Sequence, residues 1–333
     1  MKLSGCTTVR GPAMIAVRDG DLKLMGGPVT AGSSITVPVG RAVIAEGDGE
    51  VEISGGQLGQ CDPEGLKALE SLIDELRGAR RVVLVGPTDS GKSTLAAYLY
   101  NSGAVNSIIS TDVGQNEVYC PGFEALSMPP RPFTPGSSAP EPLSACLVGD
   151  YTPRGLEARY LACAIRLSRL SGSFVVDTDG WASGEGAELK AALALAVGAD
   201  AVVAIGLDQG SLSILRHEMA GPLVVAPRLA PAGKSQAERR TNRDRLLASC
   251  MMGSRRRVLS LDGLLVEGRE PEAWKGLLVG LRDAGGDHFA VVERGPSRSG
   301  SITVLTQYMG SVELIRLGRA RVDLKAFGGL LQA

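Results

Sequence analysis

The fold of this chain follows from one stretch, Gly86-Pro87-Thr88-Asp89-Ser90-Gly91-Lys92-Ser93-Thr94, which matches the pattern G-x-x-x-x-G-K-[ST]. It follows the apolar run Val82–Val85 and precedes the helix-like segment Ser93–Tyr100. A strand before the loop and a helix after it form the context in which this pattern binds phosphate groups. The glycines let the backbone curl so that successive N–H groups face a phosphate, and the helix adds its partial positive end.

The positions of this loop predict a site for ATP and Mg²⁺. We expect the whole loop from Gly86 to Thr94 to line the nucleotide. Lys92 would reach the β- and γ-phosphates, and the hydroxyl of Ser93 would ligate Mg²⁺. The alternative, a glycine-rich turn that binds nothing, requires the motif and its strand–helix context to coincide by chance.

Apolar strands alternate with longer helix-like segments from Arg81 to about Gly253. Continuous apolar runs are typical of strands that are buried on both faces of a parallel sheet. The alternation predicts an α/β domain, a P-loop NTPase domain with a mostly parallel, doubly wound sheet. The expected strands are Val82–Val85, Ile108–Ser110, Phe174–Val176, Val202–Ile205 and Leu223–Val225.

The segments on either side of this domain differ from it in composition and in the length of their apolar runs. From Leu3 to about Gly59 the chain is rich in Gly, Val and Thr, with short alternating runs separated by turn pairs, which predicts a small all-β domain. After Gly253 short strands return. We therefore predict an N-terminal β domain over residues 1–62, a P-loop kinase domain over 63–253 and a small β-rich domain over 254–333.

The composition limits which partners the chain can bind and indicates the cellular compartment. The formal net charge of -1 gives no global basic field, so any polyanion site must be a local patch. The 6 cysteines are scattered without a Cys-x-x-Cys pair, which predicts neither a zinc site nor a disulfide framework and fits a reducing cytoplasm. The apolar stretch Leu189–Leu207 is broken by Lys190 and Asp200, so we expect no membrane span.

Carboxylates follow two of the expected strands. Asp112 comes just after Ile108–Ser110, at the strand end where ligands bind in α/β sheets. There it would hold the Mg²⁺ shell or accept a proton from an attacking hydroxyl, unless it only caps a turn. Asp177 and Asp179 end the next strand, as a second acidic group near the metal or as part of an ordinary Asp-Gly turn.

Trp181 and a group of arginines complete the candidate site. Trp181 is one of only 2 tryptophans and would either stack on a base or fill the core. The arginine helix carries guanidiniums that would clamp migrating phosphoryl charge, unless they form a solvated face. Its members are Arg239, Arg240, Arg243 and Arg245. Neither histidine lies in a motif, so we expect carboxylate-assisted phosphoryl transfer.

Together these segments resemble the polynucleotide 5′-hydroxyl kinase family of the Clp/Grc type. The compact chain is similar to the archaeal members, and the family has the same order of β, kinase and C-terminal domains. The resemblance rests on Gly86–Thr94, Asp112–Gln115 with Pro121-Gly122, Gly149–Pro153, Asp177–Trp181 with Gly184–Gly186, and the arginine helix. Family members often carry Asn-Thr where this chain has Asp177-Thr178, which leaves the role of Asp177 open.

The resemblance implies a role for each candidate residue. Asp112 would be the general base near the 5′-hydroxyl, with Gln115 beside it. Trp181 would stack near the bound nucleotides. The arginine helix would be a lid over the phosphates, with Arg240 and Arg245 as the charge-stabilising pair. Further substrate contacts are expected from the segment around Thr152 and from Arg239 and Arg243.

The sequence thus predicts an ATP-dependent kinase that phosphorylates the 5′-hydroxyl end of RNA, with single- or double-stranded DNA as a further substrate. Lys92, Asp112, Arg240 and Arg245 would be catalytic, and Ser93 and Asp112 would hold Mg²⁺. Two alternatives stay open. The chain could be a catalytically silent ATP-binding scaffold of an RNA-processing complex, or a P-loop kinase for a small-molecule hydroxyl. No guanine-reading Asn-Lys-x-Asp motif occurs, which excludes a Ras-like GTPase.

Overall fold

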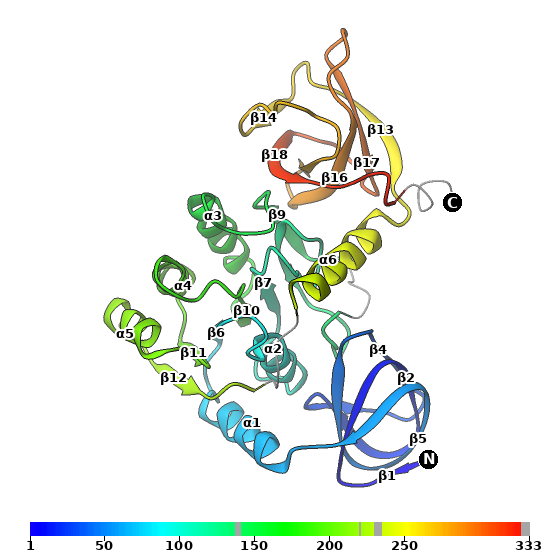
Figure 1. Cartoon of the computed structure of the whole chain (residues 1–333), viewed down its shortest axis with the longest axis vertical. Helices are drawn as coiled ribbons and strands as arrows, with labels where there is room; N and C mark the ends of the chain where they lie inside the picture. Colours follow the sequence, from blue (N-terminus) through cyan, green and yellow to red (C-terminus); the bar gives the residue numbers. More distant parts are fainter. Residues whose placement is uncertain (137–140, 220, 230–234, 328–333) are drawn as a thin grey trace. The chain divides into compact units, whose positions relative to one another are not determined.

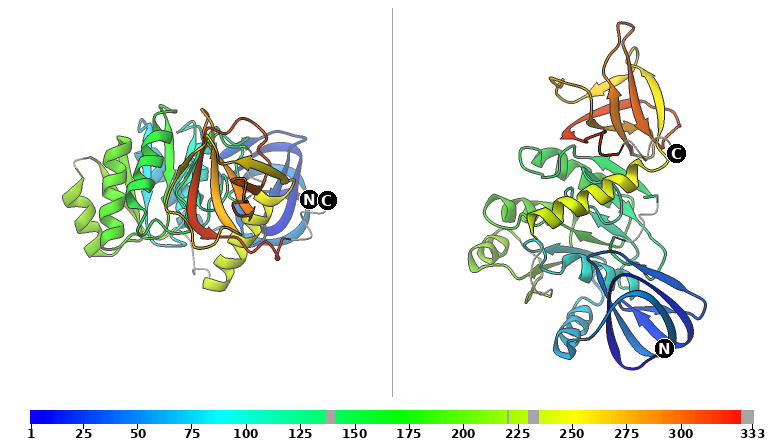
Figure 2. Two further views of the ribbon diagram at one scale, coloured as in Figure 1. Left: turned by 90° about the horizontal axis from the view of Figure 1, so that it is seen from above. Right: turned by 45° about the vertical axis from the view of Figure 1, so that its right-hand side comes forward.

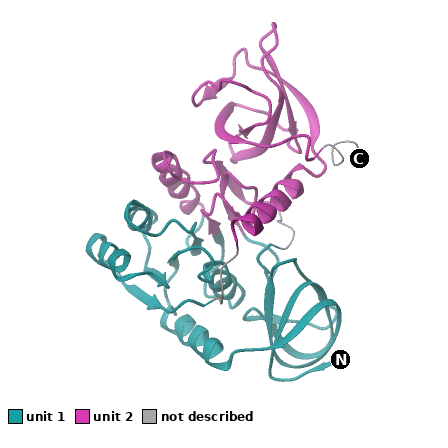
Figure 3. Ribbon diagram, in the orientation of Figure 1, with its two compact units in different colours: residues 1–108, 128–139, 171–233 teal, residues 109–127, 140–170, 234–333 magenta. Residues whose placement is uncertain are grey.

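The chain forms two compact units (Figure 3). The computed structural model describes residues 1–136, 141–219, 221–229 and 235–327. Unit 1 comprises Met1–Ile108, Met128–Ala139 and Ser171–Gly233, and unit 2 comprises Ile109–Ser127, Pro140–Leu170 and Lys234–Ala333. The phosphate-loop motif therefore belongs to unit 1, whereas Asp112 and the arginine helix belong to unit 2.

Unit 1 begins with a five-stranded antiparallel sheet curled into a small barrel-like body (Figure 1). Its two long strands pair along most of their length and bury alternate side chains, such as Ile15 and Val17 of β2. That alternation is the pattern of a sheet with one face on the core. The strands are β1 (Lys2–Leu3), β2 (Cys6–Leu24), β3 (Gly27–Val29), β4 (Ser34–Val37) and β5 (Ala42–Gln60).

The α/β part of unit 1 contains four strands that pair in parallel, in the order β12-β11-β6-β10. The apolar residues of β6, β10 and β11 are buried almost completely, as the continuous apolar runs predict, whereas β12 at the edge is only partly buried and Val225 is 50% exposed. The strands are β6 (Arg81–Val85), β10 (Phe174–Asp177), β11 (Ala201–Ile205) and β12 (Leu223–Ala226). The helices are α1 (Pro63–Glu75), α2 (Lys92–Asn101), α4 (Glu185–Val197) and α5 (Gln209–Glu218). The predicted α/β class is confirmed.

The N-terminal sheet is joined to α2 within unit 1. The Asn101 amide donates to the carbonyls of Met25 and Phe133, at 3.1 and 2.9 Å, and accepts from the Phe133 N–H at 2.7 Å. A Cβ on Gly26 would lie 2.7 Å from Cδ1 of Tyr98, so the turn approaches the helix where only glycine leaves room. The N-terminal sheet and the helix that follows the phosphate loop therefore pack against each other.

Unit 2 contains three further strands of the α/β part and a separate six-stranded sheet. The chain enters it through β7 (Ile108–Ser110), and β8 (Phe123–Ser127) and β9 (Ser144–Leu147) pair antiparallel. The six C-terminal strands surround an apolar core (Figure 2). The helices are α3 (Glu157–Ser168) and α6 (Gln236–Met251). The strands are β13 (Arg255–Ser260), β14 (Leu265–Glu267), β15 (Leu277–Arg282), β16 (Asp287–Arg294), β17 (Ser301–Thr306) and β18 (Leu314–Arg321).

A buried carboxylate ties the C-terminal strands to β9. Oδ2 of Asp287 accepts from the Leu147 N–H and from a guanidinium N–H of Arg316, both at 2.7 Å. Such a carboxylate is stable in the interior because it has charged and backbone donors. The boundaries predicted at residues 62 and 253 fall between β5 and α1 and between α6 and β13.

The expectation of no disulfide framework is wrong. The structure pairs Cys6 with Cys61, Cys120 with Cys250 and Cys146 with Cys163. The partners lie 55, 130 and 17 residues apart, so their proximity is a product of the fold and leaves no local spacing signal. Among the described helices, none has the length and apolar character that crossing a bilayer requires.

Candidate phosphate-transfer site

The phosphate loop leaves β6 at Gly86 and enters α2 at Lys92. Gly91 occupies the N-cap with φ +104°, in the left-handed region that favours glycine. A Cβ on Gly86 would lie 2.5 Å from the carbonyl oxygen of Ile205, so the turn after β6 requires glycine as well. Because Gly91 has no side chain to cap the helix, the first N–H groups of α2 are suited to an anion.

Lys92 is seated inside this loop. Its side chain is buried, and Nζ donates to the carbonyls of Gly86 and Pro87, at 2.8 and 2.9 Å. Two of the three N–H donors of the ammonium group therefore bond to the backbone of the loop and fix the position of its positive charge. A triphosphate bound on the loop N–H groups would meet this charge at its β- and γ-phosphates.

Arg228 braces the loop from the segment after β12. Its guanidinium donates to the carbonyls of Thr88 and Asp89, at 2.9 and 3.2 Å, and the next residue, Leu229, donates its N–H to Ser90 O at 2.9 Å. Sequence reasoning did not single out Arg228. Its only signal was a position just after an apolar strand, at the strand end where α/β sheets bind ligands.

Asp177 lies beside Ser93, whose hydroxyl is the predicted Mg²⁺ ligand of this loop. The buried carboxylate, at the end of β10, accepts a hydrogen bond from the Ser93 side chain. Burial raises the pKa of Asp177, and the nearby charge of Lys92, the Ser93 hydroxyl and the charge of Arg41 act in the opposite direction. A hydroxyl and a carboxylate in contact are the oxygen ligands that suit Mg²⁺ in phosphate loops.

The loop after Asp177 packs directly on the phosphate loop. The hydroxyl of Thr178 donates to Leu84 O at 2.6 Å, and a Cβ on Gly180 would lie 2.1 Å from Oγ1 of Thr88. Asp179, the other carboxylate considered for the metal, instead pairs with Lys190 at 2.6 Å. Trp181 follows this turn and is partly exposed.

Asp112 orients its own loop in unit 2. Its Oδ1 accepts the N–H groups of Gly114 and Gln115, at 3.0 and 2.9 Å. The turn-capping interpretation is therefore correct for this oxygen, and it fixes the direction of the carboxylate. The Gln115 side-chain oxygen accepts from Nδ2 of Asn242 on α6 at 3.0 Å, which joins this loop to the arginine helix.

The predicted arginines lie on different sides of α6. The guanidinium of Arg243 lies 4.7 Å from the centre of the Tyr151 ring, a cation–π contact. Arg245 donates to Oδ1 of Asn242 at 3.2 Å, and burial lowers the pKa of its guanidinium. Arg239 is partly buried, whereas Arg240 is exposed.

Two neighbours of these arginines complete this part of unit 2. Thr152 uses its Oγ1 to accept the Arg154 N–H at 3.4 Å, within the segment that carries Tyr151. Asn242 links Gln115 to Arg245, and sequence reasoning missed it because a lone asparagine in a charged helix carries no signal. In the described ranges no group of three or more His, Cys, Asp or Glu side chains is placed to hold a metal ion.

A family model matches the central part of the chain. Residues 86–249 match the family model described as the P-loop of mRNA cleavage and polyadenylation factor CLP1. This segment, just under half of the chain, is similar to the CLP1 P-loop family. The segment includes the phosphate loop, Asp112, Asp177 and most of α6.

Curated relatives align with parts of the chain. The polyribonucleotide 5′-hydroxyl-kinase of Pyrococcus furiosus is 30% identical over 151 residues, which cover 43% of this chain and 42% of the relative. That of Pyrococcus abyssi is 28% identical over 208 residues, which cover 59% and 57%. The matched segment thus spans about half the length of these relatives.

Solved structures extend the fold similarity to nearly the whole chain. A chain in the structure of the wild-type Clp1p–Pcf11p (454–563) complex superposes with a TM-score of 0.71 at 14% identity, covering 96% of this chain and 97% of the other. A second, titled for the Pcf11p–Clp1p interface and for ATP loss in a Gly135Arg mutant, gives 0.69 at 14% identity, covering 96% and 98%. At this identity the similarity shows the fold.

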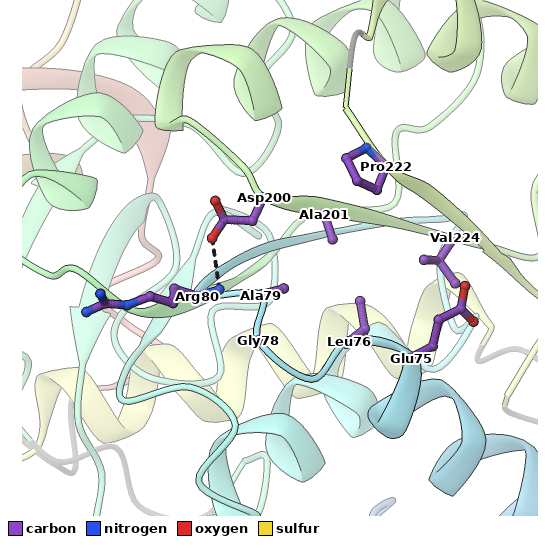
Figure 4. Close-up of a pocket in the computed structure, with 9 residues that line it drawn as sticks. All are labelled: Glu75, Leu76, Gly78, Ala79, Arg80, Asp200, Ala201, Pro222 and Val224. Carbon is purple, nitrogen blue, oxygen red and sulfur yellow. Dashed lines mark hydrogen bonds between the residues drawn. The ribbon is translucent and has the colours of Figure 1, made fainter.

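A cavity of about 480 Å³ in unit 1 is lined by residues outside the phosphate loop (Figure 4). Its lining residues stand at the end of α1 and at the starts of β6, β11 and β12, and Gly86 follows the opposite end of β6. Asp200 is held there because its Oδ2 accepts the N–H groups of Arg80 and Arg81, at 2.8 and 2.9 Å. The cavity is therefore separate from the candidate site.

Asp177→Asn should change how stability depends on pH. Because burial raises the pKa of Asp177 above its ordinary value of 3.8, the folded chain keeps this proton to higher pH than the unfolded chain. The folded state then binds more protons above pH 3.8, so this carboxyl makes stability fall as the pH rises through its folded pKa. We expect the asparagine variant to gain Tm relative to the wild type as the pH rises from about 4 towards neutrality.

Circular dichroism melts across this range measure the difference. Asp19→Asn, at an exposed carboxylate of the N-terminal sheet, is the matched control and should show no such trend. A difference in Tm between Asp177→Asn and the wild type that stays constant with pH would contradict the assignment.

Proposed function

We propose that the chain transfers the γ-phosphate of ATP to the 5′-hydroxyl end of RNA. The observation that carries the proposal is Lys92 seated in the phosphate loop with Asp177 beside Ser93. This donor geometry lies in the segment that matches the CLP1 P-loop family model, and archaeal proteins that align with part of the chain are named polyribonucleotide 5′-hydroxyl-kinases.

The residues of unit 1 would bind and polarise the triphosphate. The loop from Gly86 to Thr94 would cradle the phosphates with its N–H groups, and Lys92 would neutralise charge on the β- and γ-phosphates. Ser93 and Asp177 fit as residues that would hold Mg²⁺, and the bound ion would supply positive charge that offsets the charge of the phosphates. The contacts of Ser93 with Asp177 favour this pair over the pair of Ser93 and Asp112 predicted from the sequence.

The residues of unit 2 would prepare the acceptor. Asp112, oriented by its two N–H bonds, would accept the proton of the 5′-hydroxyl as that oxygen bonds to the γ-phosphorus. The bond from the γ-phosphorus to its bridging oxygen breaks, and ADP leaves. Gln115 and Thr152 would contact the substrate end, and Trp181 of unit 1 would stack on a base.

The arginine helix would stabilise the transferred charge. Arg245, partly buried next to Asn242, is well suited because a guanidinium removed from water interacts more strongly with phosphate oxygens. Arg239, Arg240 and Arg243 would add phosphate contacts to the substrate or the transition state. Most of the acceleration would come from positioning and electrostatics.

Lys92→Ala should abolish transfer from radiolabelled ATP to a 5′-hydroxyl RNA oligonucleotide. The substitution removes the cation at the β- and γ-phosphates and the two bonds that shape the loop. Lys67→Ala, at an exposed lysine of α1, is the control and should keep the wild-type rate. Turnover in Lys92→Ala equal to that of the wild type would refute the mechanism.

Asp112→Asn should keep ATP binding and lose most of the rate. Asparagine retains the Oδ1 that caps the turn but is not a general base, and such a base contributes about 10²- to 10⁴-fold. The measurements are kcat with 5′-hydroxyl RNA and ATP affinity by calorimetry. Asp262→Asn, at an exposed position of the C-terminal unit, controls for loss of a carboxylate. Full kcat in Asp112→Asn would exclude the base assignment.

A further inference from the structure

One face of α4 carries a glycine in its first turn and a fully buried lysine, and both are unfavourable at these positions. Gly186 and Lys190 are four residues apart, so they lie one above the other on the helix. Gly186 is buried in the first turn, and the Lys190 side chain is 0% exposed. A glycine weakens a helix and a fully buried lysine is costly, so both residues call for a physical reason.

The buried lysine holds the turn that precedes Trp181. Nζ of Lys190 donates to Oδ2 of Asp179 at 2.6 Å, and Oδ1 of the same carboxylate accepts the Trp181 N–H at 2.7 Å. Both oxygens of Asp179 are thus engaged, one by the helix and one by the turn. A buried ion pair contributes little net stability compared with an apolar pair of similar volume, whereas it fixes geometry where both partners are fully bonded.

The glycine makes room for the indole. A Cβ on Gly186 would lie 2.5 Å from Cδ1 and 2.6 Å from Cγ of Trp181, closer than real Cβ atoms approach. The ring of Trp181 therefore rests against the first turn of α4, where only glycine leaves space. One helix face sets both the backbone and the ring of the same tryptophan.

We propose that Lys190 is a positioning residue that acts through Asp179 to hold Trp181 for stacking on a base of the nucleic-acid end. The proposal rests on the proposed function, because it assigns the aromatic contact of that site. The same turn presses Gly180 against Thr88, so it keeps Trp181 next to the phosphate loop. Gly186 contributes by leaving space for the indole, and Lys190 contributes through its ion pair with Asp179.

The test uses Trp181 as its own reporter. Trp274 is the other tryptophan of the chain, so Trp274→Phe leaves Trp181 as the only indole. In that background the variants are Lys190→Met, Gly186→Ala and the double variant Asp179→Asn/Lys190→Met. Glu188→Gln, at an exposed position of α4, is the control. The readouts are Trp181 emission and acrylamide quenching without substrate, and KM for a 5′-hydroxyl oligonucleotide and for ATP.

We expect Lys190→Met and Gly186→Ala to shift the emission and to raise acrylamide quenching of Trp181. Each should raise KM for the oligonucleotide about tenfold or more, the scale of one lost base stack, with a much smaller change for ATP. The double variant should recover much of the loss, because the asparagine that replaces Asp179 would leave no unpaired buried charge and its Oδ1 would still accept the Trp181 N–H. Glu188→Gln should match the background in every readout.

Unchanged emission, quenching and oligonucleotide KM in Gly186→Ala and in a folded Lys190→Met would overturn the proposal. A parallel rise in both KM values with unchanged emission would do the same, since it indicates general damage. If Lys190→Met does not fold, Gly186→Ala and the double variant decide. The emission and quenching measurements need no kinase activity. Failure of the proposed function would therefore be seen separately, because the Trp274→Phe protein would transfer no phosphate.

Discussion

The donor part of the candidate site depends on the ammonium group of Lys92, which donates to two backbone carbonyls of the phosphate loop. Lys92 reaches back from the first residue of α2 to Gly86 and Pro87 and so connects the end of β6 to the start of the helix. Further contacts surround the loop that Lys92 closes in this way. Arg228 and Leu229 hold the outside of the loop, and Gly180 fits against it with no space for a side chain.

A buried cation in such a loop needs nearby negative charge, and two carboxylates with different environments follow β10. Asp177 contacts Ser93 and interacts with the charge of Lys92, and in the proposed mechanism it would hold Mg²⁺. Asp179, two residues later, is neutralised by Lys190 and carries the Trp181 N–H, so it belongs to the positioning of an aromatic ring. In our proposals, the end of one strand thus supplies one carboxylate for the phosphate donor and one that positions a substrate contact.

The sequence predicted those features that are local. The phosphate loop, its flanking strand and helix, and the α/β class are encoded in contiguous motifs and apolar runs, and the structure places them as expected. The position of Asp177 depends on β10 lying next to β6, and apolar runs do not specify strand order. The disulfides pair cysteines up to 130 residues apart, which spacing alone does not reveal.

Lys190 shows most clearly why the remainder could not be predicted. In the sequence it only interrupts an apolar stretch, and its partner became known from the fold. The central claim is that the acceptor is the 5′-hydroxyl of RNA. The most direct measurement supplies radiolabelled ATP and Mg²⁺ in parallel with 5′-hydroxyl RNA, 5′-hydroxyl DNA and a nucleoside. We predict label on the RNA 5′ end, with little or none on the nucleoside. Label on the nucleoside alone, or on none of the three, would contradict the account.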